Sequence, residues 1–517
     1  MTSMPPRQQQ PASTNDNTWA ESSPETSPGS LVAQYATINV DTPMDLENHD
    51  ISSSPSKKRF IVPRACDRCK RLRRGCSEYR PCRRCTDAGV ADQCQVVTTA
   101  VTSDASPGDL QSAYRRLSEL VSVTIIDHCA AIFFERLYPT IPILIPEYIS
   151  RLKADAFSSL SIENLGRVKS LCVLVAMCGQ VLLQTGGSED LFNQGLIPEG
   201  GQAFGQMLLD ALVSVYQILP RYTPVTIQSC LTSFFLYACE TGLSHHSRAF
   251  QFLREATTLL LLFQLNNATD NLDRLIHGRL FWVLLISERS HAIRYRRPIT
   301  MQITAETPSL DTTDPQLAGF WSLAALFSPI DTSFVAVFNH EVISISVTPE
   351  SLDNVESRVN LALSPLRLDL HDTQKANLRV TQLWLRIIIW KLRLHLGYLV
   401  EDSYQHNLTF RYPIDVAKDL MLSTSDLLPS SLEVHGVGMT EKLFDVASAL
   451  VDVLARIPIN SPSLNRNAAM DTLPEDVLSY LRNLIRKLPE GEGVYDDLIE
   501  KHIQQTAPNL ATERFKK

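Results

Sequence analysis

The chain has 517 residues, of which 44% are hydrophobic and 20% are charged, and it carries a formal net charge of −8 at pH 7. This length exceeds what a single ordinary core needs, and the composition is that of a soluble globular protein with polar tails rather than a fibrous chain. The polar, proline-bearing start argues against a secretory signal peptide. The longest apolar runs, 257–265 and 280–287, are much shorter than the ~20 residues of a membrane span, so we expect no membrane partner.

Residues 1–60 are predicted to form a disordered tail with a basic end. Their content of Pro, Ser, Thr, Gln and Asn is high, and large apolar residues are few. Segment 44–50 mixes acids with Met and Leu, as activation segments do, although such a composition more often marks a solvated tail. The basic end is a candidate nuclear import signal or an extension of a basic surface, and it consists of Lys57, Lys58 and Arg59.

Six of the eleven cysteines lie close together and include two CxxC pairs. In chain order they are Cys66, Cys69, Cys76, Cys82, Cys85 and Cys94. A CxxC pair places two sulfurs near one tetrahedral ion, and in a reducing compartment such clusters bind metal rather than form disulfides. One zinc ion needs four ligands and leaves two cysteines over, whereas two zinc ions share six sulfurs only if two sulfurs bridge. The spacing therefore favours a binuclear zinc cluster over a single-zinc site or a disulfide framework.

The same segment concentrates positive charge. Residues 57–85 hold twelve Lys and Arg against Asp67 and Glu78, in a chain whose net charge is negative. A compact cationic patch on an acidic protein is the electrostatic footprint of a polyanion. The predicted partner is double-stranded DNA.

The cysteine spacing, the basic stretch CKRLRRGC and the proline before the fourth cysteine resemble the fungal zinc binuclear cluster (Zn2Cys6) transcription factors. The resemblance implies a DNA-binding domain over residues 61–96, a two-helix cluster that holds two zinc ions in a nuclear protein. It implies that Cys66 and Cys82 bridge the ions. Cys69 and Cys76 would then complete one site, and Cys85 and Cys94 the other.

The family's base-reading residue is usually a lysine four positions after the second cysteine, and the family typically reads CGG-type triplets. Here that position is Arg73, which can contact guanine bidentately. Leu72 and Gly75 stand where the family often has basic residues. The candidates for phosphate contacts are Lys70, Arg71, Arg74, Arg83 and Arg84. One triplet gives little specificity. The resemblance implies a possible homodimer on paired triplets, and the weak heptads leave a monomer open.

Residues 97–109 are small and polar, which predicts a linker. Residues 110–127 carry apolar residues at heptad-like spacing over about two heptads. This is too short to distinguish a dimerisation helix from an ordinary amphipathic helix.

Residues 128–457 show helical periodicity almost throughout, and the C-terminal tail, 458–517, contains the weaker segments 474–488 and 494–506. We therefore predict a mostly α protein with a large all-α domain. The clearest helical segments are 167–184, 225–242, 247–266, 274–295, 377–399 and 439–457. The cysteines expected in its core are Cys129, Cys172, Cys178, Cys230 and Cys239.

Several stretches of the helical domain look like the middle regulatory domain of the same fungal factors, including 133–144 and 278–300. Stretches 380–390 and 432–454 narrow the resemblance to regulators of amylolytic genes and their relatives. That subgroup implies control of carbohydrate utilisation or of a biosynthetic gene cluster.

The chain contains no P-loop, GxSxG or HExxH motif, so an enzyme with a zinc accessory module is the least favoured alternative. The leading prediction is a nuclear transcription factor that contacts the transcription machinery as an activator, with a repressor as the alternative. Arg294, Arg296 and Arg297 are expected to end a helix, and alternatively to hold an anionic small-molecule effector.

Overall fold

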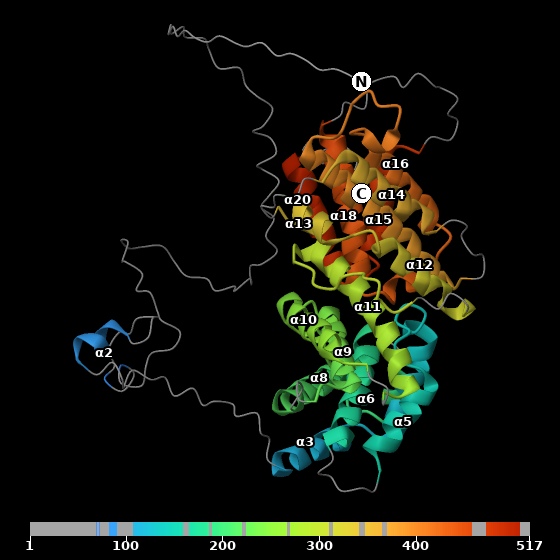
Figure 1. Ribbon diagram of the computed structural model, residues 1–517. Coiled ribbons are helices and arrows are strands. Elements are labelled where there is room, and N and C mark those ends of the chain that lie inside the picture. The colour runs from blue at the N-terminus through green and yellow to red at the C-terminus, as the bar shows by residue number, and fades with distance from the viewer. Residues whose placement is uncertain are drawn as a thin grey trace, which may run out of the picture. The chain divides into compact units, whose positions relative to one another are not determined.

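The structure, a computed structural model, is helical in every regular element that it describes (Figure 1). It describes residues 69, 72, 82–89, 107–158, 165–185, 189–219, 224–265, 269–309, 314–340, 347–363, 370–456 and 472–506. No strand occurs in these ranges, which confirms the mostly α prediction. The predicted tail 1–60 lies outside the described residues.

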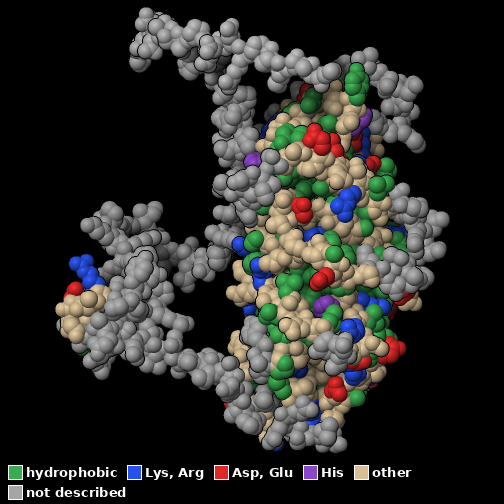
Figure 2. Space-filling view, viewed as in Figure 1, with side chains coloured by type: hydrophobic (Ala, Val, Ile, Leu, Met, Phe, Trp, Pro, Cys, Tyr) green, Lys and Arg blue, Asp and Glu red, His purple; other side chains and the backbone are tan. Residues whose placement is uncertain are grey.

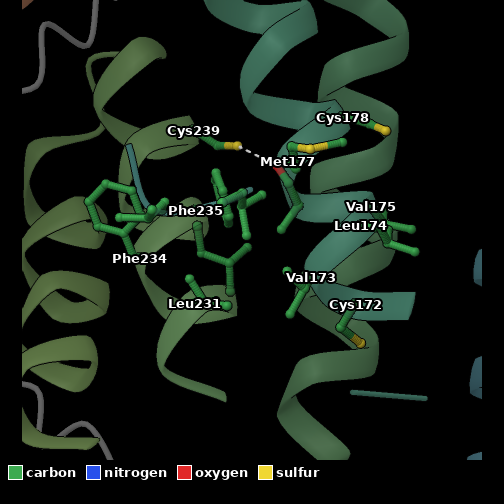
Figure 3. Packing of buried hydrophobic residues seen from close by; sticks show 14 of the residues in the cluster. Cys172, Val173, Leu174, Val175, Met177, Cys178, Leu231, Phe234, Phe235 and Cys239 are labelled. Carbon is green, nitrogen blue, oxygen red and sulfur yellow. Dashed lines mark hydrogen bonds between the residues drawn. The ribbon is translucent and has the colours of Figure 1, made fainter. Parts of the chain in front are cut away.

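A first helical group extends from α3 to α11. Its members are α3 (Pro107–Leu120), α4 (Val123–Ile132), the π-helix η4 (Phe133–Leu137), α5 (Pro146–Ala156), α6 (Leu165–Gln184), α7 (Glu189–Asn193), α8 (Gly201–Ile218), α9 (Ile227–Gly242), α10 (His246–Leu262) and α11 (Asn271–Tyr295). Helix α6 lies at its centre and contacts α4, α5, α8 and α9. Figure 3 shows Val173 of α6 and Leu231 and Phe235 of α9 pointing toward one another. All five cysteines predicted for this core are buried.

Among the described residues, α6 is the one single helix that is long and apolar enough to cross a membrane. Two bent pairs, 111–120 with 123–137 and 318–327 with 332–338, pass the same test only if each pair is taken as one span. In this fold 83% of the apolar stretch of α6 is buried inside the protein. The helix therefore has the surroundings of a core helix.

A second helical group extends from η5 to α20. It consists of η5 (Pro315–Leu317), α12 (Ala318–Phe327), α13 (Thr332–Phe338), α14 (Pro349–Leu361), α15 (Asp372–Leu396), η6 (His406–Leu408), α16 (Tyr412–Thr424), α17 (Pro429–Glu433), α18 (Val437–Arg456), α19 (Pro474–Ile485), η7 (Gly491–Tyr495) and α20 (Asp496–Thr506). Helix α15 is its centre and contacts α12, α14, α16 and α18. The long α11 contacts α9 and α10 of the first group and α12 and α13 of the second (Figure 1).

Helix α15 starts at Asp372, five residues before the predicted segment 377–399, and it ends at Leu396, three residues before the end of that segment. His371 and Gln374 form a capping box, which satisfies backbone N–H groups at the start of the helix. Gly397 follows the last turn with φ 73°, a left-handed conformation that glycine adopts without strain. Local capping chemistry therefore shifted both ends.

Helix α3 packs its apolar face inside the first helical group. Ala113, Tyr114 and Leu117 are buried, and α3 contacts α6 and α8. The Tyr114 hydroxyl donates to the Ala156 carbonyl oxygen at 2.8 Å. The helix ends at Leu120, and α4 begins after its own N-cap. The heptad-like face is thus covered within the chain, as in an ordinary amphipathic helix, and dimerisation stays a prediction.

The arginine group at the end of α11 does terminate the helix. Arg296 is the C-cap residue, with a left-handed φ of 51°. The guanidinium of Arg297 lies 5.3 Å from the ring centroid of Phe250. Arg294 is instead turned into the protein, where it forms an ion pair with Glu441 of α18. This ion pair joins the first helical group to the second.

A second buried ion pair fixes α15 against α14. Arg393 is 1% exposed and pairs with Glu356, whose other carboxylate oxygen accepts a hydrogen bond from the Tyr412 hydroxyl at 2.9 Å. The amide of Asn407 donates to the same carboxylate at 2.8 Å. Such groups are stable inside a protein only while each charge keeps its partners.

Replacing Arg393 by alanine is expected to lower the free energy of unfolding by about 3–5 kcal/mol, because it leaves the Glu356 carboxylate buried without its counter-charge. Urea denaturation followed by circular dichroism measures the loss. The matched control is Arg116→Ala on the exposed face of α3, which is expected to change the same quantity by less than about 0.5 kcal/mol. Equal effects of the two substitutions would contradict the role given to the buried pair.

Candidate metal centre

Three cysteine sulfurs converge in the described part of the cysteine segment. The Sγ atoms of Cys69, Cys82 and Cys85 all lie within 4.8 Å of one another, and the three residues are at most 2% exposed. The Sγ atoms of Cys69 and Cys82 are 3.8 Å apart. A disulfide would require about 2.05 Å, whereas two sulfurs bound at ~2.3 Å to one tetrahedral zinc ion lie about 3.8 Å apart. The separation fits two ligands of one ion.

A short helix places Cys82 and Cys85 on the same side. Cys82 is extended, and α2 (Arg83–Asp87) starts directly after it. The Cys82 carbonyl oxygen accepts hydrogen bonds from the N–H of Cys85 at 2.8 Å and of Thr86 at 3.0 Å. The chain turns away at Gly89, whose φ is +66°. One helical turn thus converts the CxxC spacing into two neighbouring thiols.

The sulfur of Cys82 lies close to both of the other sulfurs. In the resemblance, Cys69 and Cys85 belong to different zinc ions, and a bridging Cys82 contacts both ions. The 4.8 Å limit holds for all three pairs of sulfurs, so this distance does not distinguish Cys82 from the other two, and its bridging role stays a prediction. The donor set is suited to zinc, which thiolates bind strongly.

Arg83 and Arg84 lie at the start of α2 and are exposed. Figure 2 shows basic side chains on the surface of this described part of the segment. Arg83 also approaches Asp87 one turn later at 3.9 Å, with both side chains largely in solvent. Exposed pairs of this kind contribute little energy, so this ion pair adds little to the stability of α2.

The structure brings together three of the six predicted zinc ligands, Cys69, Cys82 and Cys85. Leu72, three residues after Cys69 in the sequence, is 45% exposed. The remaining predicted site residues lie outside the described residues: Cys66, Cys76, Cys94, Lys70, Arg71, Arg73, Arg74, Lys57, Lys58 and Arg59.

Sequence reasoning missed Glu441 and Lys442, two charged residues buried in the apolar helix α18. Glu441 accepts from Arg294 and Tyr295 of α11 and, at 3.0 Å, from the Tyr495 hydroxyl. The sequence signal that could have indicated these buried charges is the adjacent pair of Glu441 and Lys442 within the strongly apolar segment 437–454.

The chain is similar to several fungal regulatory proteins, although no protein-family model matches it. The "Probable sucrose utilization protein" of Candida albicans is 25% identical over 292 residues, 54% of this chain and 54% of that protein, so the chain spans about half the length of this relative. A maltose fermentation regulatory protein of Saccharomyces cerevisiae is 22% identical over 435 residues, 78% of this chain and 86% of the relative. A respiratory transcription factor of the same yeast is 23% identical over 361 residues, 68% of this chain and 74% of the relative. These homologues confirm the predicted relationship to fungal regulators of carbohydrate genes and transcription.

Replacing Cys82 by serine is expected to lower the zinc content of the purified full-length chain, because a predicted zinc ligand is lost, and to remove most of it if Cys82 bridges two ions as predicted. Elemental analysis by mass spectrometry gives the zinc content per chain. Cys239→Ala, a change to a buried thiol of α9, is the control and is expected to keep the full zinc content. A Cys82→Ser chain that retains the zinc of the unchanged chain would exclude Cys82 as a ligand.

Proposed function

We propose that this chain, a homologue of fungal sugar-utilisation regulators, is a zinc-dependent, DNA-binding transcription regulator of carbohydrate genes and not an enzyme. The observation that carries the proposal is the group of three buried sulfurs, Cys69, Cys82 and Cys85, beside the exposed Arg83 and Arg84. Metal-ligand spacing next to exposed cations is the arrangement expected of a small nucleic-acid-binding module. A regulator of this kind acts in the nucleus.

The proposed cofactor is a pair of zinc ions held by six cysteines, with Cys66 and Cys82 as the bridges. The segment is too short to bury a hydrophobic core of its own, so metal binding would supply most of its folding free energy. The role of zinc here is structural: it holds the basic side chains at fixed positions. The domain boundaries given from the sequence, with the cluster at 61–96 and the regulatory domain at 128–457, are part of this proposal.

The proposed DNA contact divides the basic residues into two classes. Arg73 would read guanine of a CGG-type triplet through two parallel hydrogen bonds in the major groove. Lys70, Arg71, Arg74, Arg83 and Arg84 would contact phosphates, which orient the module without reading sequence. Two modules on paired triplets, joined as a homodimer, would provide the specificity that one triplet lacks.

The direction of regulation is assigned to the two tails: 1–60, which lies outside the described residues, and 458–517, of which residues 472–506 are described as α19, η7 and α20. We propose an activator that contacts the transcription machinery, with a repressor as the alternative. The test fuses residues 1–60 or 458–517 to a neutral DNA-binding domain in front of a reporter gene. Reporter output above that of the DNA-binding domain alone supports an activator, and reduced output supports a repressor.

Genome-wide mapping of bound sites tests the proposed gene set. Enrichment upstream of genes for sugar uptake and breakdown is expected. Enrichment confined to a biosynthetic gene cluster would replace carbohydrate utilisation as the target while leaving the DNA-binding function in place. An absence of enriched sites would contradict the proposed function itself.

Replacing Arg73 by alanine is expected to cost about 1–3 kcal/mol on the preferred duplex and to relax base preference, because a base-edge contact is lost. Arg83→Ala is expected to weaken binding to all duplexes alike and to reduce its salt dependence, because a phosphate contact is lost. Equilibrium binding to specific and random duplexes at several salt concentrations separates the two effects. Equal losses on both duplexes for Arg73→Ala would contradict its assignment, and Arg116→Ala serves as the charge-matched control.

A further inference from the structure

A cavity of about 170 Å³ lies inside the helical body, where the first and second helical groups meet. Its walls come from η4, α6, α9, α11, α12, α15 and α18. Apolar side chains such as Leu137, Val283 and Phe320 form part of the wall. The polar side chains of the wall include those of Arg136, Gln184, Arg294, Asn377, His435 and Lys442.

The cavity wall is positively charged. It contains three cationic side chains, and no aspartate or glutamate occurs among the described residues that line it. The carboxylate of Glu441, behind the wall, neutralises Arg294. Arg136 donates to a neutral acceptor, the Thr185 carbonyl oxygen, at 2.7 Å. The cavity is partly open to solvent and Arg136 is exposed, and positive charge in such a partly desolvated cleft attracts an anion more strongly than the same charge does in bulk water.

Lys442 is the buried cation of the wall whose hydrogen-bond partner is neutral, although the Glu441 carboxylate also favours its charged form. It is 8% exposed, and its Nζ donates to the Thr381 hydroxyl oxygen at 2.7 Å and lies 5.6 Å from the centroid of the Trp384 ring. These partners are neutral, so they offset only part of the cost of removing the ammonium group from water. Burial, and next the nearby Arg294 guanidinium, lower the pKa of Lys442 to about 7. A bound anion would favour the charged form of this lysine.

Neutral groups at the wall can complete the recognition of such a ligand. Burial lowers the pKa of His435 to about 4, so the ring is uncharged near neutral pH. Its Nε2 lies 2.9 Å from the Thr373 carbonyl oxygen and donates to it, which leaves Nδ1 as an acceptor for a protonated oxygen of the ligand and not for an ionised one. The amide oxygen of Asn377 accepts from Thr381 at 3.1 Å, and its amide nitrogen adds a further donor to the wall.

The volume limits the ligand to a small molecule. An engineered cavity of ~150 Å³ in another protein accepts benzene, so 170 Å³ suits a compact molecule of about ten or fewer non-hydrogen atoms. An intact disaccharide would exceed this volume and would have to extend out of the open side of the cavity. Carboxylates and phosphates of three-carbon size have both the volume and the charge that the wall requires.

We propose that this cavity binds a small anionic metabolite, a carboxylate or phosphate of three-carbon size, and that this ligand is the effector of the regulator. The effector role rests on the proposed function, whereas the binding itself does not. Because the wall residues belong to both helical groups, the bound anion stabilises the packing of the two groups in which Arg136, Arg294 and Lys442 line the same cavity. A ligand that binds only this arrangement shifts the population toward it.

The test uses the full-length, zinc-loaded chain and isothermal titration calorimetry with named probes. Phosphoenolpyruvate, pyruvate and inorganic phosphate form the anionic arm, and glucose and maltose form the neutral arm. Saturable binding of at least one anionic probe is expected, with no binding of maltose. Binding of maltose alone, or saturation by none of the anions into the millimolar range, would overturn the proposal.

Two substitutions separate a binding role from a structural one. Lys442→Met keeps the side-chain volume and removes the charge, so anion affinity is expected to fall by about tenfold or more. The same chain without ligand is expected to melt at or above the temperature of the unchanged chain, because a poorly paired buried cation is gone. Lys375→Met, at a surface ion pair on α15, is the matched control and should leave anion affinity unchanged. Unaltered affinity in Lys442→Met would show that the anion binds elsewhere.

Binding of each preparation to a CGG-containing duplex keeps the two proposals distinct. Anion binding without duplex binding would contradict the proposed function and would still support the assignment of the cavity as an anion site. Duplex binding without anion binding would support the proposed function and would contradict the assignment of the cavity as an anion site. When both occur, a change in reporter output on raising the probe concentration in permeabilised cells, absent in Lys442→Met, establishes the effector role, and an unchanged output overturns it.

Discussion

The carboxylate of Glu441 cannot lie inside the helical body unless other groups compensate its charge, and the groups that do so come from distant parts of the chain. Arg294 and Tyr295 approach it from the end of α11, and Tyr495 approaches it from η7. A buried carboxylate deprived of these partners would cost several kcal/mol. The first and second helical groups are therefore held together at this point by an electrostatic requirement as well as by apolar contact. The cavity lies beside this junction, where the backbone of both groups is already fixed.

The cysteine segment and the helical body are stabilised by different forces. In the body, helices such as α6 and α15 are buried on most of their faces, so hydrophobic burial dominates their stability. In the cysteine segment, α2 has five residues and its buried residue is a thiol, Cys85. A helix of that length is not stable alone. Chelation of metal is thus expected to unfold one part of the chain while the other keeps its helicity.

The sequence predicted those features that depend on neighbours along the chain. CxxC spacing is local, and it correctly indicated that Cys82 and Cys85 lie together. Helical periodicity located α9, α11 and α18 to within a few residues. It did not predict the buried charges, because the partner of Glu441 is Arg294, 147 positions away, and periodicity carries no information on such pairs. The cavity depends on seven elements at once, and its existence follows only from their packing.

The burial of Tyr114 and Leu117 sets the length of the tether between the two functional parts. Because α3 is anchored in the helical body from its first turns and the proposed zinc ligands extend to Cys94, only residues 95–106 remain between the proposed cluster and α3. Even fully extended, so short a chain reaches no more than about 45 Å. In the proposed dimer, each cluster would therefore stay within little more than one turn of the DNA helix from its own helical body, since one turn is about 34 Å. The second cluster would search for its triplet at a high effective concentration, so that two weak contacts act as one strong one.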